Sequence, residues 1–245
     1  MADGPSIYLL NTTNGVLQVE LTSSTNPAIH PRTWLDNTRV YVTLQLVDGP
    51  PESVAILDTS KGPNQKVQNL RVAFDASTST PFCWDFDSSF DGKNLFTSQC
   101  TASSSGGPGA NIFNGPGVIS VRDAQGFSYS FVYVNQGQAF TAVRAVTSNT
   151  LLFTVGNTTG DTSQNGLWKV GTNGSNPAHL APSGQFNQFT QLPWSNVSRD
   201  SSKYALQIVS GITYTLEYGS LGGGSPVVFA SISNVQLATV GWTTM

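Results

Sequence analysis

The chain has 245 residues and a net charge of −3, and only 10% of its residues are charged, against about 25% in an ordinary soluble domain. Its few Lys and Arg residues are scattered, so the sequence lacks the basic patch that binding to nucleic acid requires. No apolar run approaches the roughly 20 residues of a membrane helix, and residues 1–5 show no basic or apolar export signal, so we expect neither in this segment.

The first predicted element is a pair of strands that recurs along the chain. An alternating strand ends in a polar turn with Gly, and a short apolar strand follows. The first copy runs from Ser6 to Gly15 and is followed by VLQVEL, and later copies begin at Ser53, Gly117, Asn165 and Ile212. Alternation with a period of two residues, bounded by turn residues, predicts strands, and no segment predicts a helix.

A second unit lies between these pairs. It places Trp on a strand, then a Ser, Asp or Asn turn, then an apolar strand. The unit is found at Trp34, Trp84 and Trp194, and Trp242 occupies the same place near the C-terminus, whereas the copy at 140–157 lacks the Trp. These residues indicate a period near 50 residues, with a double interval after Trp84. Four short strands fill such a period, which is the size of a propeller blade.

The turns of these units resemble the repeat of TolB-like β-propellers. The resemblance is clearest in Ser89-Phe90-Asp91-Gly92-Lys93, in 198–203 and in 167–177, and it covers nearly the whole chain. It implies an all-β propeller of about five four-stranded blades. The repeats are placed at about 22–74, 75–134, 135–180 and 181–230, with a closing blade from 231–245 and 6–21. This repeat occurs in periplasmic scaffold proteins and in propellers of prolyl-peptidase-like enzymes, so it implies architecture and not activity.

The closing blade lacks its second strand. Three explanations stay open: a three-stranded blade, a boundary that cuts a larger propeller short, or a strand supplied by another chain. We expect a closed ring of five blades, because an open ring leaves strand edges unpaired and a sixth blade would need about 50 more residues. The chain is accordingly expected to be a monomer or to exchange a strand with a second chain.

The two cysteines are predicted to form a disulfide. Cys83 lies on the first strand of a blade and Cys100 at the end of the second, with the Asp91-Gly92 turn midway between them. Directly opposed residues of an antiparallel pair lie within disulfide range. A metal site or a reactive thiol is the weaker alternative, because there is no C-x-x-C motif. A disulfide implies an oxidising compartment, so we expect an extracytoplasmic protein.

The sequence shows no catalytic constellation. It contains no G-x-S-x-G motif and no phosphate loop or dinucleotide fingerprint, so no cofactor is expected. Asp85, Asp87 and Asp91 lack the spacing of a calcium loop, and Asp91 is assigned to a turn. His30 is placed on a loop that enters a first strand and His179 on an outer strand. The Trp residues, repeated on inner strands, are expected to pack between blades.

Binding is therefore expected on the loops, where propellers carry their function. The loops at 101–116, 157–164 and 181–188 are predicted to emerge on one face. The candidate ligand or partner residues are Asn111, Ile112, Phe113, Asn114, Phe186 and His30.

These observations predict a non-enzymatic binding or scaffold module for an unidentified protein or glycan, belonging to a larger exported or surface protein. The alternatives are a carbohydrate-binding lectin, which would gain if the Trp faces were exposed, and a propeller hydrolase or lyase with a site at the channel mouth.

Overall fold

The computed structural model describes residues 6–22, 27–46, 51–61, 70–75, 83–89, 91–104, 111–123, 129–182, 196–198, 200–235, 237 and 242. Strands make up the regular structure, apart from two short 3-10 helices, η1 (Thr59–Lys61) and η2 (Thr162–Gln164). Within these ranges, no helix has the length and apolar character of a membrane span. The all-β prediction is confirmed.

The seventeen strands of the described ranges form five antiparallel sheets, each in chain order. The first sheet pairs β1 (Ser6–Leu10) with β2 (Leu17–Thr22). The second contains β3 (Pro27–Trp34), β4 (Arg39–Leu46), β5 (Pro51–Asp58) and β6 (Leu70–Asp75). The third contains β7 (Trp84–Ser88), β8 (Asn94–Ser104), β9 (Asn111–Asp123) and β10 (Tyr129–Asn135). The fourth contains β11 (Phe140–Ala145), β12 (Thr150–Val155), β13 (Gly166–Gly171) and β14 (Ala178–Ala181), and the fifth β15 (Lys203–Ser210), β16 (Thr213–Ser220) and β17 (Val227–Ser233).

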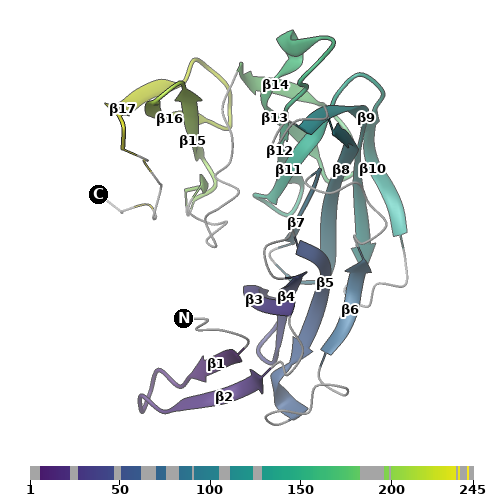
Figure 1. Ribbon diagram of the computed structural model, residues 1–245, viewed down its shortest axis with the longest axis vertical. Coiled ribbons are helices and arrows are strands. Elements are labelled where there is room, and N and C mark those ends of the chain that lie inside the picture. Colours follow the sequence, from purple (N-terminus) through teal and green to yellow (C-terminus); the bar gives the residue numbers. More distant parts are fainter. Residues whose placement is uncertain are drawn as a thin grey trace.

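The sheets are the blades of a propeller. In Figure 1 they follow one another around an arc, with the β1–β2 sheet at one end and the β15–β17 sheet at the other. Gln207 of β15 donates its side-chain N–H to the carbonyl of Leu237, so the described part of the C-terminal segment lies against the fifth sheet. No ladder in the described ranges joins this segment to β1 or β2, and closure of the ring stays a prediction.

The strand register corrects one reading of the repeat. The last residues of β3, β7 and β11 face the second strand in the pairs Trp34↔Val40, Ser88↔Leu95 and Ala145↔Leu151, and the isolated bridge Val197↔Tyr204 is the corresponding pair of the fifth blade. The second-strand members of these pairs are therefore equivalent, and they follow one another at intervals of 53 to 56 residues. Trp34 thus matches Ser88, whereas Trp84 lies four residues earlier on its strand. Trp34 and Trp84 therefore do not occupy equivalent places in their blades.

The hydrophobic core lies between blades. One cluster joins Leu35, Tyr41 and Ile56 of the second sheet to Phe86 and Leu95 of the third. Similar clusters join the third sheet to the fourth and the fourth to the fifth. β12 is buried on both faces, because its neighbours in the ring cover each side, and this explains its continuous apolar sequence TLLFTV. Burial of apolar area at these contacts drives the blades together.

The disulfide prediction is confirmed. Cys83 directly precedes β7 and Cys100 belongs to β8, and the two are bonded across the hairpin with their Cα atoms 5.3 Å apart. The N–H of Cys100 also donates to the carbonyl of Cys83 at 3.0 Å, as expected for opposed residues of an antiparallel pair. The bond closes the third sheet at the end remote from its Asp91-Gly92 turn.

Candidate functional site

Three inner strands bring four charged side chains together. β3 supplies Arg32, β7 supplies Asp85 and Asp87, and β11 supplies Arg144. The two carboxylates are two residues apart and therefore lie on the same face of β7. Arg144 is buried and forms an ion pair with Asp85. Neither arginine was among the predicted site residues, although an isolated Arg within the apolar strand FTAVRA is the signal of a buried ion pair.

The two carboxylates accept hydrogen bonds from main-chain N–H groups of the next blade. Asp85 accepts the N–H of Val143 at 3.2 Å, and Asp87 accepts the N–H of Ala145 at 2.9 Å. The other oxygen of Asp87 accepts the N–H of Ser88. These donors point away from β12, so the carboxylates cap the inner edge of β11, which would otherwise present unpaired N–H groups. Asp85 and Asp87 therefore couple the third sheet to the fourth.

Burial dominates the electrostatics of this cluster. It raises the pKa of Asp87 to about 6, and the attraction of Arg144 and the hydrogen bond from Ala145 offset only part of that effect. Burial opposes the charge of Arg144, but the two carboxylates outweigh it and raise the pKa of the guanidinium. Burial lowers the pKa of Arg32, whose guanidinium lies 5.4 Å from the centre of the Phe86 ring.

His30 does not lie on a loop, as the sequence analysis placed it, but within β3. Its Nδ1 is buried and has no hydrogen-bond partner in the described part of the chain. Burial, and next the charge of Arg32, lower the pKa of the ring, so it is neutral at physiological pH. His179 lies on the outer strand β14, as predicted, and stacks on Trp168 with ring centres 4.6 Å apart.

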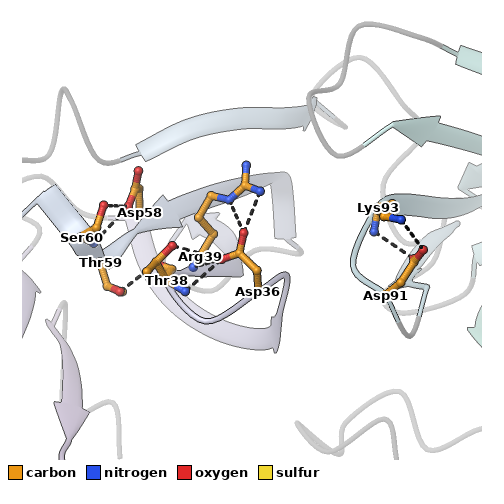
Figure 2. A network of polar contacts seen from close by, with 8 residues as sticks. All are labelled: Asp36, Thr38, Arg39, Asp58, Thr59, Ser60, Asp91 and Lys93. Carbon is orange, nitrogen blue, oxygen red and sulfur yellow. Dashed lines mark hydrogen bonds and ion pairs between the residues drawn. The ribbon is translucent and has the colours of Figure 1, made fainter.

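Asp91 has the predicted turn role. It accepts the hydroxyl of Ser89 and the N–H of Lys93, and Asp36 does the same for Thr38 and Arg39 in the preceding blade. Figure 2 shows both turns, with each carboxylate folded back onto its own loop. These hydrogen bonds lower the pKa of Asp36 to about 2. Among the described residues, no group of three His, Cys, Asp or Glu side chains is placed to hold a metal ion.

The predicted loop at 101–116 is largely strand. β8 continues to Ser104 and β9 begins at Asn111, and the pairing Ala102↔Phe113 belongs to one ladder, so the candidate residues 111–114 lie on an extended hairpin. The prediction failed because the Ser and Gly residues of this segment resemble a flexible loop, whereas pairing with β8 fixes its backbone.

The base of this hairpin is fastened to the next blade. Phe113 donates its N–H to the hydroxyl of Thr158 at 2.8 Å, and the N–H of Thr158 donates to the carbonyl of Phe113 at 3.1 Å. The hydroxyl of Thr159 donates to Asn114 at 2.6 Å. We name Ile112, Phe113, Asn114, Thr158 and Thr159 the loop platform.

A buried amide holds the platform in place from below. Asn157 donates to the carbonyls of Gly137 and Asp161 and accepts the N–H of Ala139. It thereby joins the β12–β13 loop to the β10–β11 connection. Thr158 and Thr159 are exposed, and the three hairpin residues are half-buried. The structure thus brings two of the three predicted loops together, while Phe186 and its loop lie outside the described residues.

The inner-strand Trp residues differ in exposure. Trp84 packs against the core cluster between the second and third sheets, as expected, whereas 53% of Trp34 is exposed at the end of β3. Trp34 borders a shallow hollow with Asp36, Asn37 and Asp91, so the expectation that it packs between blades is wrong. The physical reason is that Trp34 is the last residue of β3, whereas Trp84 lies four residues before the end of β7.

Comparison with known proteins gives the fold but no sequence relative. No family model matches the chain, and no curated protein sequence matches it. Among solved structures, an oligogalacturonate lyase in complex with manganese is similar over 92% of this chain and 58% of its own, with a TM-score of 0.54 and 12% identity. TolB from Acinetobacter baumannii is similar over 91% of this chain and 48% of its own, with a TM-score of 0.52 and 14% identity. A putative TolB from Agrobacterium tumefaciens gives a TM-score of 0.52 at 13% identity, over 94% and 75%.

The chain therefore has the fold of the TolB-like β-propellers, as its repeats predict. It spans about half the length of the first two of these structures.

Proposed function

We propose that this chain is a non-catalytic binding propeller that acts outside the cytoplasm and holds a protein partner on its loop platform. The observation that carries the proposal is the fastening of the β8–β9 hairpin to the β12–β13 loop through Phe113, Thr158 and Thr159. A surface whose backbone is fixed before binding loses less conformational entropy when a partner docks. The exposed hydroxyl oxygens of Thr158 and Thr159, whose hydrogens are donated to Phe113 and Asn114, supply acceptors for the N–H groups of a polypeptide.

The charged cluster on the inner strands supports a role without catalysis. Both oxygens of Asp87 accept main-chain N–H groups, and Asp85 is engaged by Arg144 and Val143. Carboxylates with these contacts hold neighbouring blades together, which is a structural role. The disulfide between Cys83 and Cys100 and the small number of charged residues support an extracytoplasmic location.

Two experiments test the proposal. The first is an activity assay: oligogalacturonates incubated with the chain and manganese should remain uncleaved, and formation of unsaturated product would overturn the non-catalytic assignment. The second is an interaction assay, in which peptides selected on the immobilised chain are footprinted by hydrogen exchange. Protection should fall on residues 111–114 and 157–164. Thr159→Arg should abolish binding, whereas Thr12→Arg on an exposed hairpin should not. Protection elsewhere would refute the platform as the binding surface.

A lectin function is favoured by one observation only, the exposed indole of Trp34 beside Asp36 and Asn37. Its register equivalent in the next blade is Ser88, so the exposed aromatic is not repeated there. Titration of Trp34→Ala with neutral oligosaccharides would test this second candidate.

A further inference from the structure

A polar cleft lies between the fourth and fifth sheets, on the face opposite the loop platform. It has a volume of about 450 Å³, within the range of ligand-binding pockets. The β11–β12 and β13–β14 turns form one wall, and Ser201 and Leu221 from the turns of the fifth sheet form the other. The platform instead lies on β8–β9 and β12–β13 connections, which leave the blades at the other end of the strands.

The walls of the cleft are fixed by hydrogen bonds. Thr172 donates its N–H to the carbonyl of Asn149 at 3.0 Å, which joins the two turns of the fourth sheet. Ser201 donates its hydroxyl to the carbonyl of Val146 at 2.7 Å, and Lys169 donates to the carbonyl of Leu221 at 2.9 Å. The last two bonds connect the fourth and fifth sheets, so the cleft is already formed without a ligand.

An ammonium group and two amide groups in the lining supply hydrogen-bond donors. The ammonium group of Lys169 is half-buried and uses one of its three N–H groups on Leu221. The side-chain oxygen of Asn173 accepts the N–H and the hydroxyl of Ser175, and the oxygen of Asn149 accepts the hydroxyls of Thr147 and Thr150. Because the turns engage the oxygen end of each amide, the NH₂ ends remain as donors without a partner among the described residues.

The charge of the cleft contrasts with that of the whole chain. Lys169 is the charged residue of the lining, and none of the described lining residues is acidic. The whole chain has a net charge of −3, so the cleft is a local positive site on an acidic protein. A ligand that carries a carboxylate satisfies an ammonium and amide N–H groups together, through charge-assisted hydrogen bonds.

The residues of the lining also favour a peptide over a sugar as the ligand. None of the described lining residues is aromatic, so these residues offer no face on which a sugar ring could stack. Val170 and Leu221 instead provide aliphatic contacts beside the ammonium. We infer that the cleft between the fourth and fifth sheets binds an acidic peptide segment, with a Glu or Asp carboxylate on Lys169 and peptide carbonyls on the amides of Asn149 and Asn173. This site stands independently of the loop platform.

The test uses hexaglutamate as the probe and hexaglutamine as its neutral counterpart, titrated into the whole chain and followed by calorimetry and NMR. Hexaglutamate should bind and shift the amide signals of residues 147–150 and 169–176, and binding should weaken as salt is raised. Lys169→Met should weaken binding about tenfold or more, because it removes the charge and keeps the aliphatic stem.

Asn149→Asp provides a variant that preserves the fold, since the carboxylate keeps the acceptor that the turn needs and replaces the donor by a negative charge. It should weaken hexaglutamate binding about as strongly as Lys169→Met. The matched control is Asn14→Asp, because the side-chain oxygen of Asn14 likewise accepts a hydrogen bond within an exposed turn, from the N–H of Val16, but lies on the β1–β2 hairpin. Its effect should stay below about twofold. Equal binding of hexaglutamine, equal or tighter binding of a uronic-acid oligosaccharide, or unchanged binding in both cleft variants would overturn the inference.

Discussion

The ion pair between Asp85 and Arg144 is predicted to be a main energetic link between the third and fourth sheets. The Arg144 side chain is 5% exposed and that of Asp85 is 12% exposed, so water screens the pair little. Removing one partner of a buried pair typically costs about 3–5 kcal/mol. Asp87 remains near Arg144 in Asp85→Ala, so we expect the lower end, a loss of about 3 kcal/mol in the free energy of unfolding.

A double-mutant cycle separates the pair from general damage. Asp85→Asn, Arg144→Met and the double variant are compared by urea denaturation at pH 7, and the coupling energy should be about 2 kcal/mol. Asp91 and Lys93 form the matched exposed pair, with their charged atoms 3.7 Å apart and side chains 54% and 80% exposed. The same cycle on that pair should give a coupling energy that is much smaller, because water screens exposed charges. Equal coupling energies for the two pairs would refute the reasoning.

Four further predictions concern other parts of the fold. Asp87 has a folded-state pKa of about 6, above its ordinary 3.8, so its contribution to stability is fully present below about pH 4 and is lost as the pH rises through 6. The unfolding free energy of the wild type relative to Asp87→Asn should therefore fall by up to about 3 kcal/mol between pH 4 and pH 7. A difference that does not change with pH would contradict this pKa. Replacing Cys83 and Cys100 by Ser should cost about 3 kcal/mol in denaturant titrations, and mass measurement with and without reductant should show one bond in the wild type. Gly92→Ala should lower the unfolding free energy by about 2 kcal/mol or more, because Gly92 has φ +68° and an added Cβ would overlap the carbonyl of Leu35. Its control is Gly15→Ala, which has φ +70° but no neighbouring atom near the added Cβ and should cost only about 1 kcal/mol. Thr158→Val removes the acceptor for the N–H of Phe113, so hydrogen exchange at Phe113 should accelerate while exchange within β4 stays unchanged.

The candidate site shows where sequence reasoning reached its limit. The Ser, Gly and Pro residues around 111–114 predict a loop, yet residues 111–114 pair with β8, and Phe113 contacts Thr158 of the next blade. The ion pair of Arg144 could not be predicted from the sequence, because its partner Asp85 lies 59 residues away and no local pattern connects the two residues. The Pro residues around His30 likewise predict a loop, but pairing with β4 extends strand β3 across this segment.

The sequence by itself determined the strands, the repeat of about 50 residues, the turns and the disulfide. These features depend on local rules: alternation of side chains, turn chemistry, and the opposition of Cys83 and Cys100 across one hairpin. Only the tertiary structure decided which residues of different blades meet. The strand register leaves Trp34 exposed at the end of β3. The packing of neighbouring blades brings together the residues of the charged cluster, the loop platform and the cleft around Lys169. Contacts between residues more than 40 positions apart depend on how rigid sheets stack, and a repeat pattern carries no record of that stacking.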